Sequence, residues 1–592
     1  MRLHWLTTSA KTTIKHWLDG VLVLCGIVTL ACLVSIVGWA LSPAAGEWLR
    51  RITRWVLAVF VVEELVRVSI QDNLVAFLRA RWLELSLAVL ATGELFGHGP
   101  FLAWIGGLLP DVQARTITLF YLAGTQLTVI ALIGLRALRG NRLLASRKLT
   151  PGQLFMGSFV ALILVGMLLL KTPQATVQPL AWVDALFLST SAVCVTGLST
   201  VDITEVLSVQ GRFILLALIQ VGGLGVVTFT YFFAHFMAGG MGMRTQLQLK
   251  DFFSEERLGQ IGTVLGVVVS STLAIEALGA IAIHHALQGT GVADGELAFF
   301  SIFHSVSAFC NAGFSTLPAG LADARVHLHA PFLVTIMLLI TLGGIGFPVM
   351  KNLGEVAVNR LSRTIHRRHV VRVRVTTHTK LVLLVSGVLL AGGTLLFWLL
   401  EPKPVGAGEA WLTALFNSVT ARTAGFNTVS VSSLLPASLV AMMFLMYVGG
   451  SPSSTAGGVK TTTVGVAILG LRRLVQGRAD MEFGGRRIEQ TVVTRALIIL
   501  LLSLMWCTLV VGTLAALYPK FSPMDLAFET VSALSTAGLS CGVVPELGTP
   551  GKLLLLLTMF VGRVGLLTCV MAFAREERTQ PYRLPESNLI VG

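Results

Sequence analysis

The chain has 592 residues, of which 54% are hydrophobic and only 12% are charged. This composition excludes a soluble globular protein and predicts an integral membrane protein with many spans. The net charge of +14 does not indicate nucleic-acid binding, because Lys and Arg are concentrated between the apolar runs, where they set membrane orientation.

The apolar runs are as long as helices and lack the alternation of barrel strands, so we predict an all-α protein. The first run, residues 20–41, shows no signal-peptide cleavage pattern and is long enough to span a bilayer. The seven Cys have no paired spacing, which predicts neither a disulfide framework nor a zinc site. We recognise no catalytic set, metal-ligand spacing or phosphate loop, and therefore predict no enzymatic activity and no covalently bound cofactor.

Residues 1–148 form an N-terminal extension with four candidate spans, at 17–41, 52–70, 82–106 and 117–138. The fourth span ends in Arg136, Arg139 and Arg142, at three-residue spacing. This arrangement resembles a reduced voltage-sensor domain. The alternative is a basic anchor at the cytoplasmic end of a helix, because few of these arginines lie deep in the apolar run.

Beyond the extension, a short glycine-centred turn occurs four times, at intervals of 116, 112 and 113 residues. A phenylalanine lies ten residues before the first, second and fourth glycines and nine before the third, and small hydroxyl residues follow it at the second and fourth positions. Such periodicity indicates an internal structural repeat. The glycines are Gly197, Gly313, Gly425 and Gly538.

Each turn follows an apolar segment of about a dozen residues, at 182–194, 297–309, 409–421 and 523–535. At about 1.5 Å per residue such a helix is too short to cross a bilayer, so we predict re-entrant half-helices. Ser522 and Pro523 are typical of an N-cap and a first helical position. Longer apolar runs precede these segments at 152–171, 261–286, 379–400 and 491–517, and follow them at 210–238, 331–352, 435–471 and 550–574.

We therefore predict four span–re-entrant loop–span repeats around one pore. The linkers Lys351–Lys380 and Leu471–Arg495 are basic and belong to the cytoplasm, so the four turns open to the outside. The first linker is either an orientation signal alone or also a docking site for a cytosolic partner. The repeats cover 149–250, 251–365, 366–485 and 486–578, and a cytoplasmic tail covers 579–592.

Four such turns on one axis would bind a dehydrated cation through backbone carbonyl oxygens. Glycine is needed because carbonyls that point at one axis force backbone angles that a Cβ makes costly, by about 1–3 kcal/mol per residue. Irregular backbone within the membrane is tolerated only where it lines a water-filled cavity. The candidate filter residues are Val195, Thr196, Gly197, Asn311, Ala312, Gly313, Thr423, Ala424, Gly425, Thr536, Ala537 and Gly538.

The segments Val193–Ser199, Ala421–Phe426 and Gly449–Gly458 resemble the superfamily of K⁺ transporters that includes bacterial Trk and Ktr membrane subunits and plant HKT proteins. The resemblance covers residues 149–578. It implies a K⁺ filter, because glycine in all four turns is associated there with K⁺ preference, whereas serine in the first favours Na⁺. It also implies a homodimer with one pore per protomer, a cytosolic nucleotide-binding regulatory subunit and a bacterial inner-membrane location.

The second span of the third repeat is interrupted by a polar, flexible stretch that an intact helix would not contain. The resemblance implies that this stretch blocks the pore below the filter. Arg563 stands where the other repeats have a second glycine, and it would place a positive barrier on the pore axis. The alternative role of Arg563 is a helix-packing ion pair. The interrupting residues are Gly449, Gly450, Ser451, Pro452, Ser453, Ser454, Thr455, Ala456, Gly457 and Gly458.

Two more polar residues lie in apolar surroundings. We expect Glu276 to form a hydrogen bond between helices rather than bind an ion, and Arg422 to brace the third turn from behind.

The leading hypothesis is a subunit for K⁺ uptake, with K⁺ as the substrate and Na⁺ as the alternative cation. A voltage-modulated cation channel and a Na⁺-coupled K⁺ symporter remain alternatives. The expected partners are K⁺, membrane lipid, a second copy of the chain and the regulatory subunit, with no nucleic acid.

Overall fold

The structure is a computed structural model that describes parts of 17–39 and residues 43–70, 151–238, 261–292, 294–366, 373–402, 407–478 and 480–573. In the extension, α2 (Pro43–Ile70) covers the predicted second span. The first predicted span is described only in part. The predicted spans 82–106 and 117–138, the arginines that follow them and the tail 579–592 lie outside the described residues.

Four long apolar helices occur where spans are predicted to open each repeat. Three of them, from Gly266, Thr377 and Gln490 onward, are long and apolar enough to cross a membrane. Much of their surface is exposed and apolar, as a surface that faces lipid requires, with Val388 63% and Leu501 59% exposed. The four helices are α8 (Pro151–Leu170), α13 (Ile261–Leu287), α17 (Thr377–Leu400) and α21 (Gln490–Leu517).

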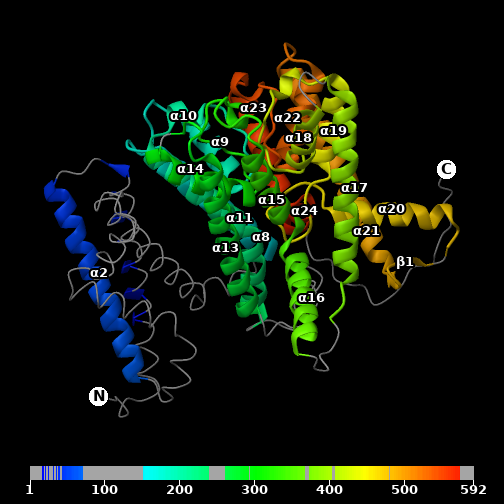
Figure 1. Cartoon of the computed structure of the whole chain (residues 1–592). Coiled ribbons are helices and arrows are strands. Elements are labelled where there is room, and N and C mark those ends of the chain that lie inside the picture. The colour runs from blue at the N-terminus through cyan, green and yellow to red at the C-terminus, as the bar shows by residue number, and fades with distance from the viewer. Residues whose placement is uncertain are drawn as a thin grey trace.

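Four short helices follow the long ones, close to the predicted bounds. The last of them begins as predicted, with Pro523 in its first turn and the Ser522 side chain accepting a hydrogen bond from the Met524 N–H. In Figure 1 these helices lie towards one end of the helical body. They are α9 (Trp182–Val193), α14 (Asp294–Phe309), α18 (Ala407–Thr420) and α22 (Pro523–Ser535).

The helices after the turns differ from one another. Only α11 (Val209–Ala238) is continuous, α15 (Ala330–Ile345) and α16 (Phe347–His366) meet at an angle of 101°, and the other two also break. The predicted spans 331–352 and 550–574 are each divided into two helices, because Gly346 and Gly565 adopt φ of +95° and +92°, which ends a helix. The remaining pieces are α19 (Pro436–Tyr447), α20 (Thr461–Val475), α23 (Thr549–Val564) and α24 (Leu566–Phe573).

The basic linkers contain more regular structure than a loop. Helix α16 carries the first linker as far as His366, because its apolar and basic residues alternate at helical spacing. In the second, β1 (Met481–Phe483) pairs with β2 (Arg486–Ile488) in an antiparallel hairpin, a small exception to the all-α prediction. Short connections form the helix α10 (Ile203–Val206) and the 3₁₀ turns η2 (Gly320–Ala322), η3 (Val431–Ser433) and η4 (Val544–Glu546).

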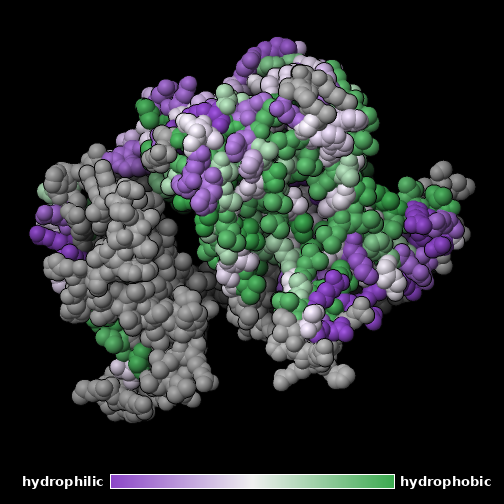
Figure 2. Space-filling view, in the orientation of Figure 1, coloured by the Kyte–Doolittle hydropathy of each residue, from purple (hydrophilic) through white to green (hydrophobic). Residues whose placement is uncertain are grey.

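The distribution of side chains matches a protein that crosses a membrane several times. Figure 2 shows hydrophobic residues across the middle of the helical body and hydrophilic residues gathered towards its two ends. The phenylalanines that precede the turns, Phe187, Phe303, Phe416 and Phe528, are fully buried. They anchor the short helices in the core, so the turns that follow are held by a rigid surround.

Candidate functional site

The four glycine turns share one unusual backbone conformation. In each turn the glycine has a positive φ, between +69° and +95°, and so does the residue two positions before it. That earlier residue is Val195, Asn311, Thr423 or Thr536, with φ between +50° and +69°. Left-handed backbone at valine and threonine is strained, by about 1–3 kcal/mol per residue, and such strain is concentrated at functional sites.

The four turns form a closed ring, in which each glycine faces a carbonyl oxygen of the next turn. A Cβ on Gly313 would lie 2.7 Å from the Ala424 oxygen, and one on Gly425 would lie 2.7 Å from the Ala537 oxygen. A Cβ on Gly197 would meet the Ala312 oxygen, and one on Gly538 would meet the Thr196 oxygen. No side chain larger than hydrogen fits at these four positions, so the close approach of the turns requires glycine.

Hydroxyl groups hold the turns from behind, as their spacing suggests. Ser191 Oγ accepts a hydrogen bond from the Gly197 N–H at 3.0 Å. The hydroxyls of Ser307 and Thr420 donate to the carbonyls of Phe314 and Phe426, at 2.9 and 2.6 Å. Three of the four turns are thus tied to the helix that precedes them.

Three threonine hydroxyls of the ring have no partner. Thr196, Thr423 and Thr536 are buried, and their Oγ1 atoms make no hydrogen bond with any described residue. Buried hydroxyls without a partner are costly in a stable protein unless an ion or water satisfies them. The described residues include no cluster of three or more His, Cys, Asp or Glu that could hold a metal, so the oxygens available to a cation in the ring are carbonyls and hydroxyls.

The interrupting segment Gly449–Gly458 packs against the base of the ring. Thr455 Oγ1 donates to the carbonyl of Phe309, at the end of α14, at 2.9 Å. The N–H groups of Ser451 and Thr455 donate to the carbonyls of Gly344 and Gly343, at 3.0 and 3.2 Å. The segment therefore replaces its missing helical hydrogen bonds with bonds to α14 and α15.

Arg563 lies buried between this segment and α11. Its guanidinium donates to the carbonyl of Thr455, and to the carbonyl of Gly222 in α11 at 2.9 Å. Carbonyl oxygens are the partners that a buried arginine needs when no acid faces it. Arg422 likewise donates to the carbonyl of Gly449, at 3.1 Å, where the segment begins.

Glu276 connects three helices by hydrogen bonds, as expected for it. Its Oε2 accepts from Gln220 Nε2 of α11 at 3.0 Å, and its backbone carbonyl accepts from Ser305 Oγ of α14 at 2.6 Å. Its Oε1 accepts a hydrogen bond from the Cys310 thiol at 3.7 Å, next to Asn311 of the second turn.

Two residues that support the outer edge of the ring were missed by the sequence analysis. His304 Nε2 is hydrogen-bonded to Ser315 Oγ at 2.9 Å, and Glu529 Oε1 accepts from Ser540 Oγ at 2.6 Å. Each follows the buried phenylalanine of its short helix, and each serine stands two residues after a ring glycine. A polar residue directly after the phenylalanine was the available signal.

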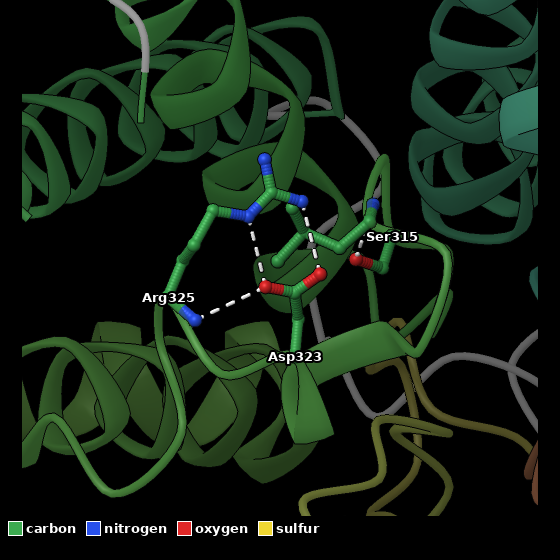
Figure 3. A network of polar contacts seen from close by, with 4 residues as sticks. Ser315, Asp323 and Arg325 are labelled. Atoms are coloured by element: carbon green, nitrogen blue, oxygen red, sulfur yellow. Dashed lines mark hydrogen bonds and ion pairs between the residues drawn. The ribbon is translucent and has the colours of Figure 1, made fainter. Parts of the chain in front are cut away.

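Beyond Ser315, the loop between the second glycine turn and α15 is held by an ion pair (Figure 3). The guanidinium of Arg325 donates to both carboxylate oxygens of Asp323, at 2.8 and 2.9 Å, and these hydrogen bonds lower the pKa of Asp323. The Ser315 hydroxyl accepts from the Leu317 N–H at 3.1 Å. The loop between the turn and α15 thus has a defined shape.

Helices of spanning length and an apolar belt define a multi-pass membrane protein, with a ring of oxygen-rich turns buried in its interior. A family model described as "Cation transport protein", the TrkH model, matches residues 155–580. The chain therefore belongs to the Trk/Ktr family of cation transport proteins, which are transporters and not enzymes.

Individual relatives agree with this assignment. The chain is 33% identical to the potassium/sodium uptake protein NtpJ of Enterococcus hirae, over 75% of its own length and 98% of that protein. It is 33% identical to the Ktr system potassium uptake protein B of Bacillus subtilis, over 75% of its length and 97% of that protein. The crystal structure of the potassium transporter TrkH from Vibrio parahaemolyticus has the same fold, with a TM-score of 0.58 at 19% identity, covering 83% of this chain and 97% of that one.

Proposed function

We propose that this protein takes up K⁺ across a bacterial inner membrane, through a filter formed by the four glycine turns. Four span–re-entrant loop–span repeats would surround this single pore. The closed ring carries the proposal, because four turns that present carbonyl oxygens to one another provide the ligands that a dehydrated cation needs. The unpartnered hydroxyls of Thr196, Thr423 and Thr536 add oxygens of the same kind.

The proposal extends to a gate formed by Gly449–Gly458 and Arg563. The segment lies at the base of the ring and is held by a few separate hydrogen bonds, which can break and reform more readily than the continuous bonding of an intact helix. The guanidinium of Arg563 adds a positive charge where a cation would pass. In this scheme the pore opens when the segment leaves its bonds to Gly343, Gly344 and Phe309.

We propose that the filter selects K⁺ over Na⁺, because all four turns have glycine. The names of the relatives support K⁺, although NtpJ is named for both ions. A Na⁺-coupled K⁺ symporter is therefore the second candidate. A partner subunit belongs to the proposal, since three relatives are named as proteins of a Ktr system. The homodimer and the nucleotide-binding, cytosolic character of that subunit are carried over from the family resemblance.

Serine at Gly197 or Gly313 tests the filter directly. Each change forces a Cβ towards a carbonyl of the next turn at left-handed φ, and we expect the ratio of K⁺ to Na⁺ uptake to fall by about tenfold or more, as 1–3 kcal/mol of distortion implies. The measurement is uptake of each cation by proteoliposomes with purified protein.

Gly289→Ser is the matched control. Gly289 also has left-handed φ, +79°, but nothing lies within 4 Å of its Cβ position. Gly289→Ser introduces the same backbone strain at a position outside the ring. The ratio of K⁺ to Na⁺ uptake by this variant should therefore equal that of the wild type. An unchanged ratio in both Gly197→Ser and Gly313→Ser would contradict the filter.

A further inference from the structure

A cavity of about 270 Å³ opens beside the third short helix, at the end of the molecule away from the basic linkers. It lies between the last turn of α17, the outward half of α18 and the chain that follows the third glycine turn. Its walls are mainly apolar and include Phe397, Trp398 and Leu434. A concave, largely apolar site with a few polar groups is the usual form of a small-molecule pocket.

The charged groups in this cavity are acidic. Glu401 and Glu409 line it together with His327, and no Lys or Arg is among its described lining residues. One oxygen of Glu401 accepts from the Leu435 N–H at 3.2 Å, so its carboxylate is held in place. These groups do not form a cluster that could hold a metal ion among the described residues. A ligand would thus be positively charged and bring its own apolar surface.

A buried polar group in the cavity wall also lacks a partner. Asn417 is 4% exposed, and its side chain makes no hydrogen bond with the described part of the chain. It directly follows Phe416, the position that His304 and Glu529 occupy in the second and fourth repeats. Those two side chains bind serines at the edge of the ring, whereas Asn417 faces the cavity. Its amide is therefore available to a ligand.

Two described parts of the cavity wall are held in place by further contacts. Trp398 stacks on Trp411, with ring centroids 5.3 Å apart and planes 20° from parallel. The loop that contributes His327 is fixed by the Asp323–Arg325 ion pair of Figure 3, and the His327 N–H donates to the Asp323 carbonyl at 2.8 Å. A pocket with fixed walls loses little entropy when it binds a ligand.

We propose that this cavity binds a small organic cation, an ammonium or guanidinium group on an apolar body, with Glu401 and Glu409 facing the charge and Asn417 bonded to it. The apolar body would lie against the apolar wall that includes Trp398 and Leu434. Because Asn417 lies one residue from the Phe416 that anchors α18, the ligand would stiffen the third turn. That effect on transport rests on the filter proposed above, whereas the binding does not.

Binding is tested with benzylammonium and the full-length protein in nanodiscs, by isothermal titration calorimetry. Saturable binding should appear, and the uncharged analogue benzyl alcohol should bind at least tenfold more weakly. Glu409→Gln and Asn417→Ala should each weaken binding at least tenfold, while Glu546→Gln, an exposed glutamate paired with Lys520, should not change it. Equal binding to the wild type and both cavity variants, or no saturable binding, overturns the proposal.

The same ammonium chemistry occurs in a lipid headgroup. Nanodiscs with phosphatidylethanolamine should show weaker benzylammonium binding than nanodiscs without it if the natural ligand is that headgroup, and equal binding if it is a solute. K⁺ uptake in proteoliposomes separates the two proposals. Uptake without benzylammonium binding overturns only the proposal that the cavity binds an organic cation. Benzylammonium binding without any cation uptake overturns only the proposed function.

Discussion

The second spans of the first and third repeats differ, although both carry a glycine pair at a similar distance after the turn. Helix α11 runs for 30 residues through Gly222 and Gly223 without interruption. The corresponding helix of the third repeat stops at Tyr447 and resumes at Thr461, after Gly449 and Gly450.

The residues after each pair explain the difference. Leu224 and further apolar residues continue α11, so the glycines only allow close packing. Ser451, Pro452 and the hydroxyl residues behind them remove a helical N–H and compete for backbone bonds, so the helix cannot continue. In these two helices the glycine pair permits a break, and the Ser and Pro that follow it in the third repeat make the break occur.

Arg563 is hydrogen-bonded to both of these regions, and its replacement should have the largest effect on K⁺ flux. Arg563→Ala deletes bonds to the carbonyls of Thr455 and Gly222. Bonds from a charged donor contribute about 1.5–3 kcal/mol each, so we expect K⁺ flux in proteoliposomes to rise by about 10- to 100-fold as the segment is released.

Two variants sharpen this prediction. Arg563→Lys keeps the charge but not the forked donors, and should give an intermediate flux. Arg212→Ala removes a bond to the Thr204 carbonyl at the outer end of α11 and should leave the flux unchanged. Wild-type flux in folded Arg563→Ala protein would contradict the gate.

Gly222→Ala tests whether α11 needs its glycine for packing. A Cβ there would clash with the end of α9, 2.8 Å from the carbonyl carbon of Val193. We expect a loss of about 1–3 kcal/mol in stability, seen as a lower thermal unfolding temperature in detergent. Gly266→Ala in α13 meets nothing within 4 Å and should be neutral or stabilising, by up to about 1 kcal/mol. Equal unfolding temperatures for the two variants would show that α11 tolerates a side chain there.

Thr455→Val should have the smallest effect on K⁺ flux. It removes the hydroxyl bond to the Phe309 carbonyl but keeps the Thr455 N–H bond to Gly343. One neutral hydrogen bond contributes about 1 kcal/mol, so we expect a rise in flux of about fivefold. Thr341→Val, which loses only a bond to its own helix at Met337, is the control. A similar flux in both variants would mean that the Phe309 contact does not restrain the segment.

The features that could be predicted from sequence are those that local chemistry determines. The short helices follow from Phe187 and its equivalents, and from the capping pair Ser522–Pro523. The long opening helices follow from their uniform apolar runs. The breaks at Gly346 and Gly565 were missed, because a single glycine in an apolar run is equally compatible with a continuous helix such as α11.

Long-range partners could not be predicted in the same way. His304 and Glu529 were visible as polar residues in apolar helices, but their bonds to Ser315 and Ser540 depend on how each chain returns after its turn. Arg563 was singled out because it replaces a glycine, yet its acceptors, Thr455 and Gly222, lie 108 and 341 residues away.

The ring of four turns is closed within one polypeptide, so each turn is encoded separately. In an assembly of four identical subunits, one codon change would alter all four turns at once. Here a change at Gly197 alters one turn and leaves Gly313, Gly425 and Gly538 as they were. Mutation can therefore change one turn of the ring at a time. Each such variant is encoded by a single gene, so selection can act on every intermediate separately.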